Sequence, residues 1–116
     1  MDTKKNQERR ETERVPVVFN VNYVHDGDYV ISSTRDISAD GMFLFTENPP
    51  NISERTTLKF SLGEANQLEV DAAVVWVNQS KDSKDHGMAV KFVKPTPRVQ
   101  RAILEAIKKV AVLGKE

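Results

Sequence analysis

The stretch VPVVFNVNYVHDGDYVISSTRD, residues 15–36, decides the fold class. From Val15 to Tyr23 every second residue is apolar, which is the pattern of a β-strand with one buried face and one face in water. The sequence HDGD at residues 25–28 then provides turn chemistry, because Asp and Gly readily adopt the backbone angles of a tight turn. Residues 29–36 supply the antiparallel partner. The stretch therefore predicts a β-hairpin whose first strand begins at Val15.

Four more strands are predicted downstream of this hairpin. Residues 42–45 are apolar on both faces, so we expect their strand to be covered on both sides. Alternation returns in residues 58–62, 68–76 and 88–93, and Trp76 shares the apolar face of its segment, which predicts a core position for this side chain. Short strands at this regular spacing predict a six-stranded antiparallel β-barrel.

The hydrophobic period changes near the C-terminus. Thr96 and Pro97 have the residue types favoured at an N-cap and at the first position of a helix. Apolar residues then recur at steps of three and four up to Leu113, which indicates an amphipathic helix. The predicted fold is mainly β, a six-stranded antiparallel β-barrel with a C-terminal α-helix. We expect the helix to pack on its own barrel, with a dimer contact as the alternative, so the chain is a monomer or a weak homodimer.

Length and composition fit one small domain. The chain has 116 residues, which we divide into a flexible arm over residues 1–14 and a barrel with its helix over residues 15–113. There is no cysteine, which excludes disulfides and thiolate metal sites and fits a reducing compartment. Because no apolar run approaches the roughly 20 residues of a membrane helix and no signal segment is present, a cytoplasmic protein without membrane insertion is expected.

Charge and residue content argue against two functional classes. Seventeen basic residues balance seventeen acidic ones, so no overall field would draw the chain onto nucleic acid, although a single-stranded nucleic-acid binder remains an alternative class. The two histidines, His25 and His86, show no metal-binding spacing and no nucleophile motif accompanies them. An enzyme is therefore not predicted, and no metal or cofactor is expected.

Two short motifs carry the chemistry. Arg10 and Arg14 form R-x-x-x-R, a spacing that occurs by chance in roughly two chains in five of this length. Asp36, Ser38 and Gly41 form D-x-S-x-x-G, which chance produces in roughly one chain in thirty. Together they offer guanidinium forks, a carboxylate and a hydroxyl, a set suited to a ligand with phosphates and a guanine edge. The alternatives are a solvated charged arm and a simple turn closed by Asp36 or Ser38.

On these residues the sequence resembles the PilZ domain family of bacterial receptors for cyclic di-GMP. RRETER before the first predicted strand, TRDISADGMFLF after the second, and GMAVKFV before the terminal helix are similar to the family pattern, and the resemblance spans residues 9–110. The family fold agrees with the barrel and helix read from periodicity. The resemblance implies that the arginines of R-x-x-x-R contact phosphates and guanine, and that the D-x-S-x-x-G residues form the barrel-side wall.

Two further residues bear on ligand binding. Arg9 occupies a position where the family varies, and an arginine there resembles the variant that accommodates two stacked cyclic di-GMP molecules. Asp40 departs from the small residue that is frequent at its position, and its carboxylate would repel phosphates. The implied function is binding of cyclic di-GMP and relay to an unidentified partner protein by ordering of the arm. A nucleotide-independent PilZ-like adaptor for protein interactions is the alternative.

Overall fold

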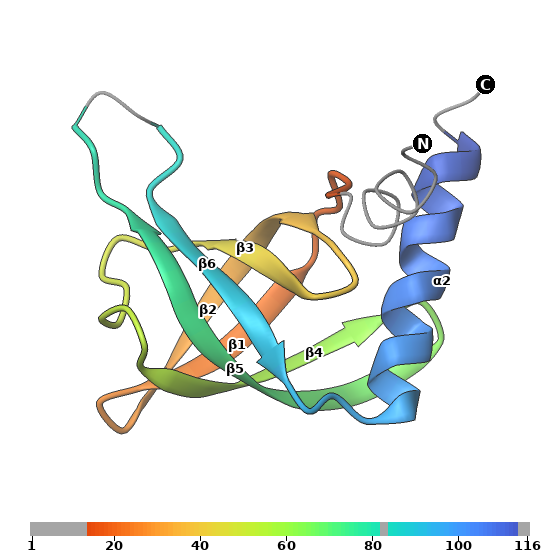
Figure 1. The fold of residues 1–116 in the computed structure, drawn as a ribbon, viewed down its shortest axis with the longest axis horizontal. Helices are drawn as coiled ribbons and strands as arrows, with labels where there is room; N and C mark the ends of the chain where they lie inside the picture. The colour runs from red at the N-terminus through yellow and green to blue at the C-terminus, as the bar shows by residue number, and fades with distance from the viewer. Residues whose placement is uncertain (1–13, 82–83, 114–116) are drawn as a thin grey trace, which may run out of the picture.

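The computed structural model describes residues 14–81 and 84–113. The strands form a closed barrel in the order β1-β2-β3-β6-β5-β4, and each neighbouring pair is antiparallel. One helix stands beside the barrel (Figure 1). This architecture confirms the predicted fold. The elements are β1 (Asn20–His25), β2 (Asp28–Ile37), β3 (Gly41–Phe45), β4 (Arg55–Leu62), β5 (Ala65–Asn78), β6 (Gly87–Val93) and α2 (Pro97–Leu113).

The barrel interior is filled by the alternating apolar residues of the strands. In β4 the side chains of Leu58, Phe60 and Leu62 are buried while the residues between them are at least partly exposed. This is the period-two pattern of a strand with one face on the core. In β3, by contrast, Met42 and Leu44 belong to the core and Phe43 between them is also buried, so the prediction of a strand covered on both faces is confirmed.

The first strand starts later than predicted. Regular pairing begins at Asn20, and Val15 makes only an isolated bridge to Ile37, with N–H···O distances of 2.9 Å in both directions. Pro16 has no N–H to contribute to a ladder. Beyond the bridge the Thr34 hydroxyl takes over, donating to the carbonyl of Val17 and accepting from the N–H of Phe19. The prediction of a strand from Val15 is therefore wrong, although the segment is still held against β2.

The predicted core position of Trp76 is also wrong. Pairing between β5 and β6 shifts register between Val74, which faces Val90, and Trp76, which faces Ala89. A shift of this kind leaves one extra residue in the strand and reverses the inward and outward alternation beyond it. Val74 is buried, whereas Trp76 is 48% exposed on the outer face of the barrel. The sequence alternation continues unbroken through this point, so the bulge could not be seen in it.

Helix α2 packs on its own barrel, as predicted. Its start is capped by Thr96, whose hydroxyl accepts the N–H of Val99 at 3.3 Å. Val99, Ala102 and Ile103 are buried in the same core cluster as the strand side chains. Within the part of the chain that the structure describes, no helix has the length and apolar character needed to cross a membrane.

Candidate ligand-binding site

A second irregularity, in β2, brings two charged residues to the outer surface together. Thr34 pairs with Leu44 and Asp36 pairs with Phe43, so Arg35 is the extra residue of a bulge. Thr34 and Ile37 on either side are fully buried, whereas Arg35 and Asp36 are both partly exposed. A regular strand would have placed these neighbours on opposite faces. The bulge therefore sets a guanidinium and a carboxylate next to each other.

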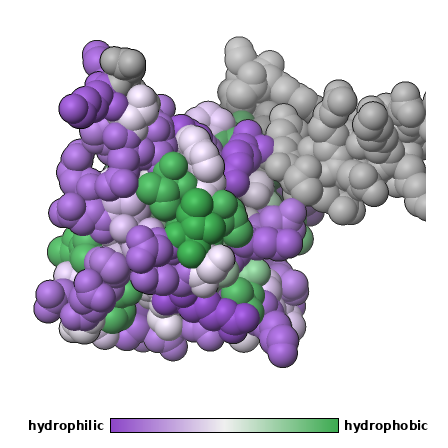
Figure 2. Space-filling view, turned by 60° about the vertical axis from the view of Figure 1, so that its left-hand side comes forward, coloured by the Kyte–Doolittle hydropathy of each residue, from purple (hydrophilic) through white to green (hydrophobic). Residues whose placement is uncertain are grey.

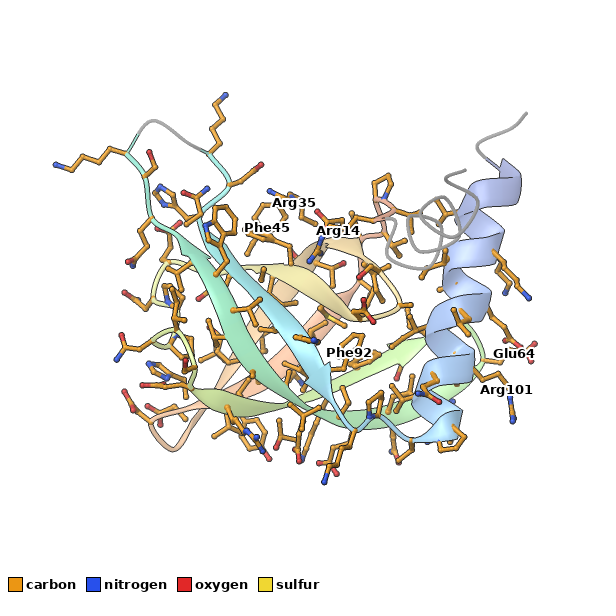
Figure 3. The ribbon with its side chains drawn as sticks, viewed as in Figure 1. Arg14, Arg35, Phe45, Glu64, Phe92 and Arg101 are labelled. Carbon is orange, nitrogen blue, oxygen red and sulfur yellow. The ribbon has the colours of Figure 1, made fainter. Side chains whose placement is uncertain are left out.

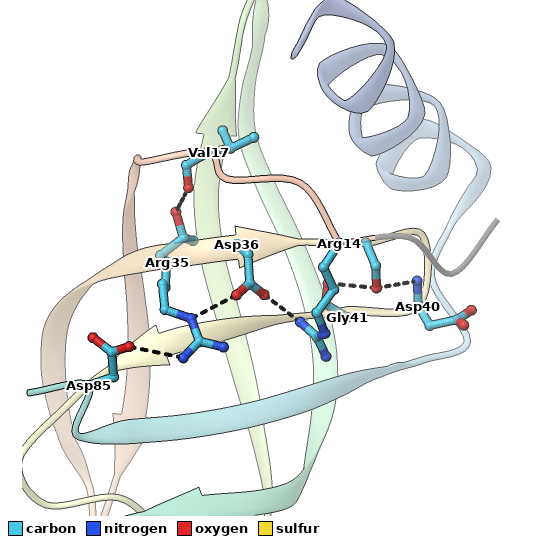
Figure 4. A network of polar contacts seen from close by, with 9 residues as sticks. Arg14, Val17, Arg35, Asp36, Asp40, Gly41 and Asp85 are labelled. Carbon is cyan, nitrogen blue, oxygen red and sulfur yellow. Dashed lines mark hydrogen bonds and ion pairs between the residues drawn. The ribbon is translucent and has the colours of Figure 1, made fainter. Parts of the chain in front are cut away.

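The Asp36 carboxylate is held by two arginines. Its Oδ1 lies 2.7 Å from an amino nitrogen of Arg14, and its Oδ2 lies 2.8 Å from Nε of Arg35 (Figure 4). The Asp36 side chain is only 14% exposed, so the contacts are partly shielded from water. Two residues of the separate sequence motifs, Arg14 and Asp36, are thus in direct contact although they lie 22 positions apart. Arg9 and Arg10 lie outside the described residues.

Arg35 is a member of this cluster that the sequence reasoning did not single out. Besides Asp36, it contacts Oδ2 of Asp85 in the β5–β6 connection at 3.3 Å. Its guanidinium carbon also lies 4.0 Å from the centroid of the Phe43 ring, a cation–π arrangement. The one signal in the sequence was its place beside Asp36. Simple alternation would have directed the two side chains apart, so only the bulge explains their contact.

Ser38 and Gly41 form the tight connection between β2 and β3. The Ser38 N–H donates to the carbonyl of Gly41 at 2.8 Å, and the Ser38 hydroxyl accepts the N–H of Asp40 at 3.3 Å. Ser38 is only 3% exposed. These contacts are those of the turn that the sequence left open as an alternative. A contact between the Ser38 hydroxyl and a ligand stays a prediction.

Gly41 is required by the barrel itself. A Cβ at this position would lie 1.9 Å from the carbonyl oxygen of Val90, which is far inside van der Waals contact. Its φ is outside the left-handed region, so glycine is needed here for the close approach of another backbone and not for a positive φ. The backbone that approaches belongs to β6. Asp40, in the same turn, is exposed and fixes β6 through its carbonyl, which accepts the N–H of Phe92 at 2.8 Å.

Aromatic side chains extend the cluster across the outer face of the barrel. The register aligns Asp36, Phe43, Ala89 and Trp76 in one row across β2, β3, β6 and β5. The Phe43 ring is 5.8 Å from Phe45 and 6.0 Å from Trp76, between ring centroids. We call these three aromatic residues the aromatic shelf. Arg14 and Arg35 meet at Asp36, and the Phe43 ring links Arg35 to Phe45; Figure 3 labels Arg14, Arg35 and Phe45.

The shelf depends on a second close approach. Gly87 of β6 faces Phe45 in the register, and a Cβ on Gly87 would meet the Phe43 ring at 2.8 Å. Phe43 is buried but is not part of the barrel core, since Arg35, Phe45 and Trp76 cover it from outside. A small apolar layer therefore lies on the outer surface. It gives the exposed Trp76 ring a firm support.

The described histidines do not form a metal site. His86 bonds Glu47 through Nδ1 at 3.1 Å and the Ser80 carbonyl through Nε2 at 2.7 Å. The Glu47 carboxylate, followed by the Ser80 carbonyl, raises the pKa of His86 above 6.5. Among the described residues, no group of three histidine or acidic side chains is arranged to hold a metal ion. The described part of the site consists of Arg14, Arg35, the carboxylates of Asp36 and Asp85 and an aromatic surface.

Comparisons with known proteins identify the family and agree with the fold. The family model described as PilZ domain matches residues 8–109. One similar solved structure is the inhibitor of motility MotI/DgrA of Bacillus subtilis, with a TM-score of 0.75 and 23% identity over 93% of this chain and 53% of that one. Another is the PilZ domain of YcgR from Escherichia coli with c-di-GMP, with a TM-score of 0.69 and 18% identity over 92% of this chain and 95% of that one. A third is the MrkH–c-di-GMP complex of K. pneumonia, with a TM-score of 0.71 and 20% identity over 92% of this chain and 54% of that one. The chain thus spans about half the length of the motility inhibitor. Curated protein sequences gave no significant match.

Proposed function

The chain belongs to the PilZ domain family, and on this premise we propose that it is a receptor for cyclic di-GMP that signals to a partner protein. PilZ domains are non-catalytic. The single observation that carries the proposal is the contact between Arg14 and Asp36, because it joins the two sequence motifs in one cluster. Each motif alone has an ordinary structural explanation, whereas their contact has the composition of a nucleotide site.

The chemistry of the cluster suits a guanine base and a phosphate. The Asp36 carboxylate can accept the ring N–H and the exocyclic amine of guanine, two donors on one edge. Arg14 now occupies Oδ1 of this carboxylate and is 42% exposed, so it has room to turn toward a phosphate or toward O6 and N7 of guanine. Arg35 would keep Oδ2 in place during this exchange. Ser38 and Gly41 contribute by fixing the turn that presents the carboxylate.

Trp76 offers a surface for base stacking. It is exposed, it rests on Phe43, and the shared register row connects it to Asp36. Stacking of a base on an aromatic side chain contributes about 1–3 kcal/mol and does not depend on the base edge. The edge contacts of Asp36 would therefore supply selectivity for guanine, and the aromatic shelf would supply affinity.

The relay to a partner rests on the arm. We propose that bound nucleotide holds residues 1–14 against the barrel through Arg9, Arg10 and Arg14, and that the partner recognises the face formed in this way. A third arginine fork at Arg9 would serve a second, stacked nucleotide. Val15 is already fixed to Ile37, next to Asp36, so a change at the site acts on the point where the arm leaves the barrel.

Calorimetric titration with cyclic di-GMP tests the proposal, with GTP and cyclic di-AMP titrated separately as control ligands. We expect heat only with cyclic di-GMP and a loss of about 1–3 kcal/mol, roughly tenfold to over a hundredfold in affinity, for Arg14→Ala. Arg101→Ala is the matched control, because Arg101 is an exposed arginine on α2, away from Arg14 in Figure 3. A native chain that gives no heat at tens of micromolar ligand would favour the nucleotide-independent adaptor. The stoichiometry also decides between one ligand and a stacked pair.

A further inference from the structure

A cavity lies beside the candidate ligand site, at the end of the barrel that carries the β1–β2 turn. Its volume is about 600 Å³, and none of the D-x-S-x-x-G residues lines it. Tyr23, Val30 and Phe45 supply apolar wall. The sides are lined by Thr46, Glu47 and Asn48 after β3 and by Lys84 and His86 before β6. The face shown in Figure 2 is largely hydrophilic, with its largest group of hydrophobic residues near the centre and smaller ones toward the edges. From its walls and charges we propose that this cavity receives an arginine side chain of a partner protein.

The charges of the lining select a cation. Among the described residues that line it, Asp26, Asp28 and Glu47 contribute three carboxylates, and Lys84 is the one lysine or arginine. A phosphate or carboxylate ligand would be repelled by these carboxylates. A wholly apolar ligand would remove hydration from the carboxylates without replacing it. A cation satisfies both the charge and the hydrogen-bonding needs of the rim.

The walls favour a cation carried on a long apolar stem. Arginine places its methylene groups along apolar surface while its charged end reaches polar groups, and its planar guanidinium also stacks on aromatic rings. The cavity provides the matching surfaces, with Val30 and Phe45 as wall and carboxylates at the rim. Tyr23 closes the bottom, since its ring is buried and its hydroxyl bonds Oγ1 of Thr46 at 2.7 Å. A hydrated ammonium ion fits such a mixed surface less well than a guanidinium.

Glu47 is the residue best placed to bind the guanidinium. It meets His86 through Oε2, and none of the described residues contacts its Oε1. Its side chain is 81% exposed, so a partner residue can reach it. Asp26 is similarly open and contacts only the His25 ring among the described residues, at 3.4 Å. Glu47 and Asp26 are therefore each in contact with a histidine, and each can still accept a hydrogen bond from a partner residue.

The cavity is also connected to the candidate nucleotide site. Arg35 contacts Asp85, and the next residue, His86, contacts Glu47. One short segment of the β5–β6 connection thus touches the ligand site on one side and the cavity rim on the other. Any movement of Arg35 when nucleotide binds would reach Glu47 through two polar contacts. Binding of an arginine side chain in the cavity needs no nucleotide, so this one contact can be tested independently of cyclic di-GMP binding.

The test is a titration of the 116-residue chain, without nucleotide, with a blocked Gly-Arg-Gly peptide, followed by two-dimensional amide NMR. We expect saturable shifts at residues that line the cavity, such as Val30 and Thr46, with affinity in the millimolar range. The same peptide with citrulline, which is the uncharged counterpart of arginine, should bind at least tenfold more weakly. A lysine peptide should fall between them.

The variants Glu47→Gln and Glu54→Gln separate the cavity from general charge effects. Both carboxylates lie between β3 and β4, but Glu54 does not line the cavity. We expect several-fold weaker arginine binding for Glu47→Gln only, with cyclic di-GMP binding retained by both variants. Equal shifts from the arginine and citrulline peptides, shifts that fall elsewhere on the protein, an unchanged affinity in Glu47→Gln, or no shifts at tens of millimolar peptide would each overturn the proposal. The amide spectrum itself confirms that each variant is folded.

Discussion

Gly41→Ala should destabilise the protein before any ligand is added. The new Cβ would lie 1.9 Å from the carbonyl oxygen of Val90, whereas ordinary van der Waals contact begins at 3.4 Å. The opposing atom is backbone, so β3 and β6 must separate by about 1.5 Å at this point, the difference between those two distances. Forcing extra volume into a packed site costs about 1–3 kcal/mol. A separation of this size also weakens one or two ladder hydrogen bonds, each with a net value of about 1 kcal/mol.

The expected net loss is about 2–4 kcal/mol, after about 0.4–1 kcal/mol is regained because alanine restricts the unfolded chain. For a domain of this size that lowers Tm by roughly 10 °C or more. Urea unfolding followed by circular dichroism measures the change. Gly27→Ala is the matched control, because Gly27 has a φ of +83° but no atoms within 4 Å of its added Cβ. It should lose only about 1 kcal/mol through backbone strain.

The comparison separates two explanations of the motif glycine. If Gly41 is needed only so that a ligand can approach, Gly41→Ala will fold with native stability and fail only in binding. If the barrel needs it, the variant will be unstable in the absence of ligand. A Gly41→Ala protein that is as stable as Gly27→Ala would refute the reasoning from the Val90 carbonyl.

Three other predictions concern the ligand site and the histidine at the cavity. Trp76→Ala should weaken cyclic di-GMP binding by about 1–3 kcal/mol, measured by calorimetry. Val75→Ala, at the neighbouring exposed position, should leave the affinity unchanged. Equal losses in both variants would exclude stacking on Trp76. Arg35→Gln should weaken cyclic di-GMP binding roughly three- to tenfold, because Asp36 loses the partner of its Oδ2. A native affinity in this variant would show that Arg35 does not position the carboxylate. NMR titration should give His86 a pKa above 6.5 in the native protein and a lower one in Glu47→Gln. Since folding raises this pKa, the protonated His86 stabilises the fold fully below pH 6.5, and this contribution is lost as the pH rises through the pKa of the folded protein. A native pKa at or below 6.5 would contradict the Glu47 contact.

Hydrophobic periodicity was enough to predict the barrel and its helix. Alternation in the strands and the change of period after Thr96 are repeated signals, and the structure places the corresponding side chains in one core. The contact between Arg14 and Asp36 was also foreseeable, because the motifs lie at the ends of predicted strands that the barrel brings together. These features depend on regular geometry, which sequence patterns report well.

The two bulges explain most of what the sequence did not reveal. Each inserts a single residue, Arg35 in β2 and Val75 in β5, and no residue type marks the insertion. Arg35 was therefore left out of the predicted site, and Trp76 was assigned to the core. Both errors fall on the outer face that we propose as the ligand surface. Bulges are frequent next to functional sites because they redirect a side chain without changing the fold.

Closure of the barrel limits how a partner can attach. In the described part of the chain each of the six strands has a neighbour on both sides, so the barrel has no edge strand that is open along its whole length. Many signalling domains capture a peptide by adding it as a further strand to an open sheet. That mode needs a strand edge that is open over several residues, and a barrel without an edge strand offers only short stretches of this kind. Recognition therefore depends mainly on side chains, which makes a partner's specificity sensitive to single surface substitutions and lets relatives with the same barrel diverge in the proteins they control.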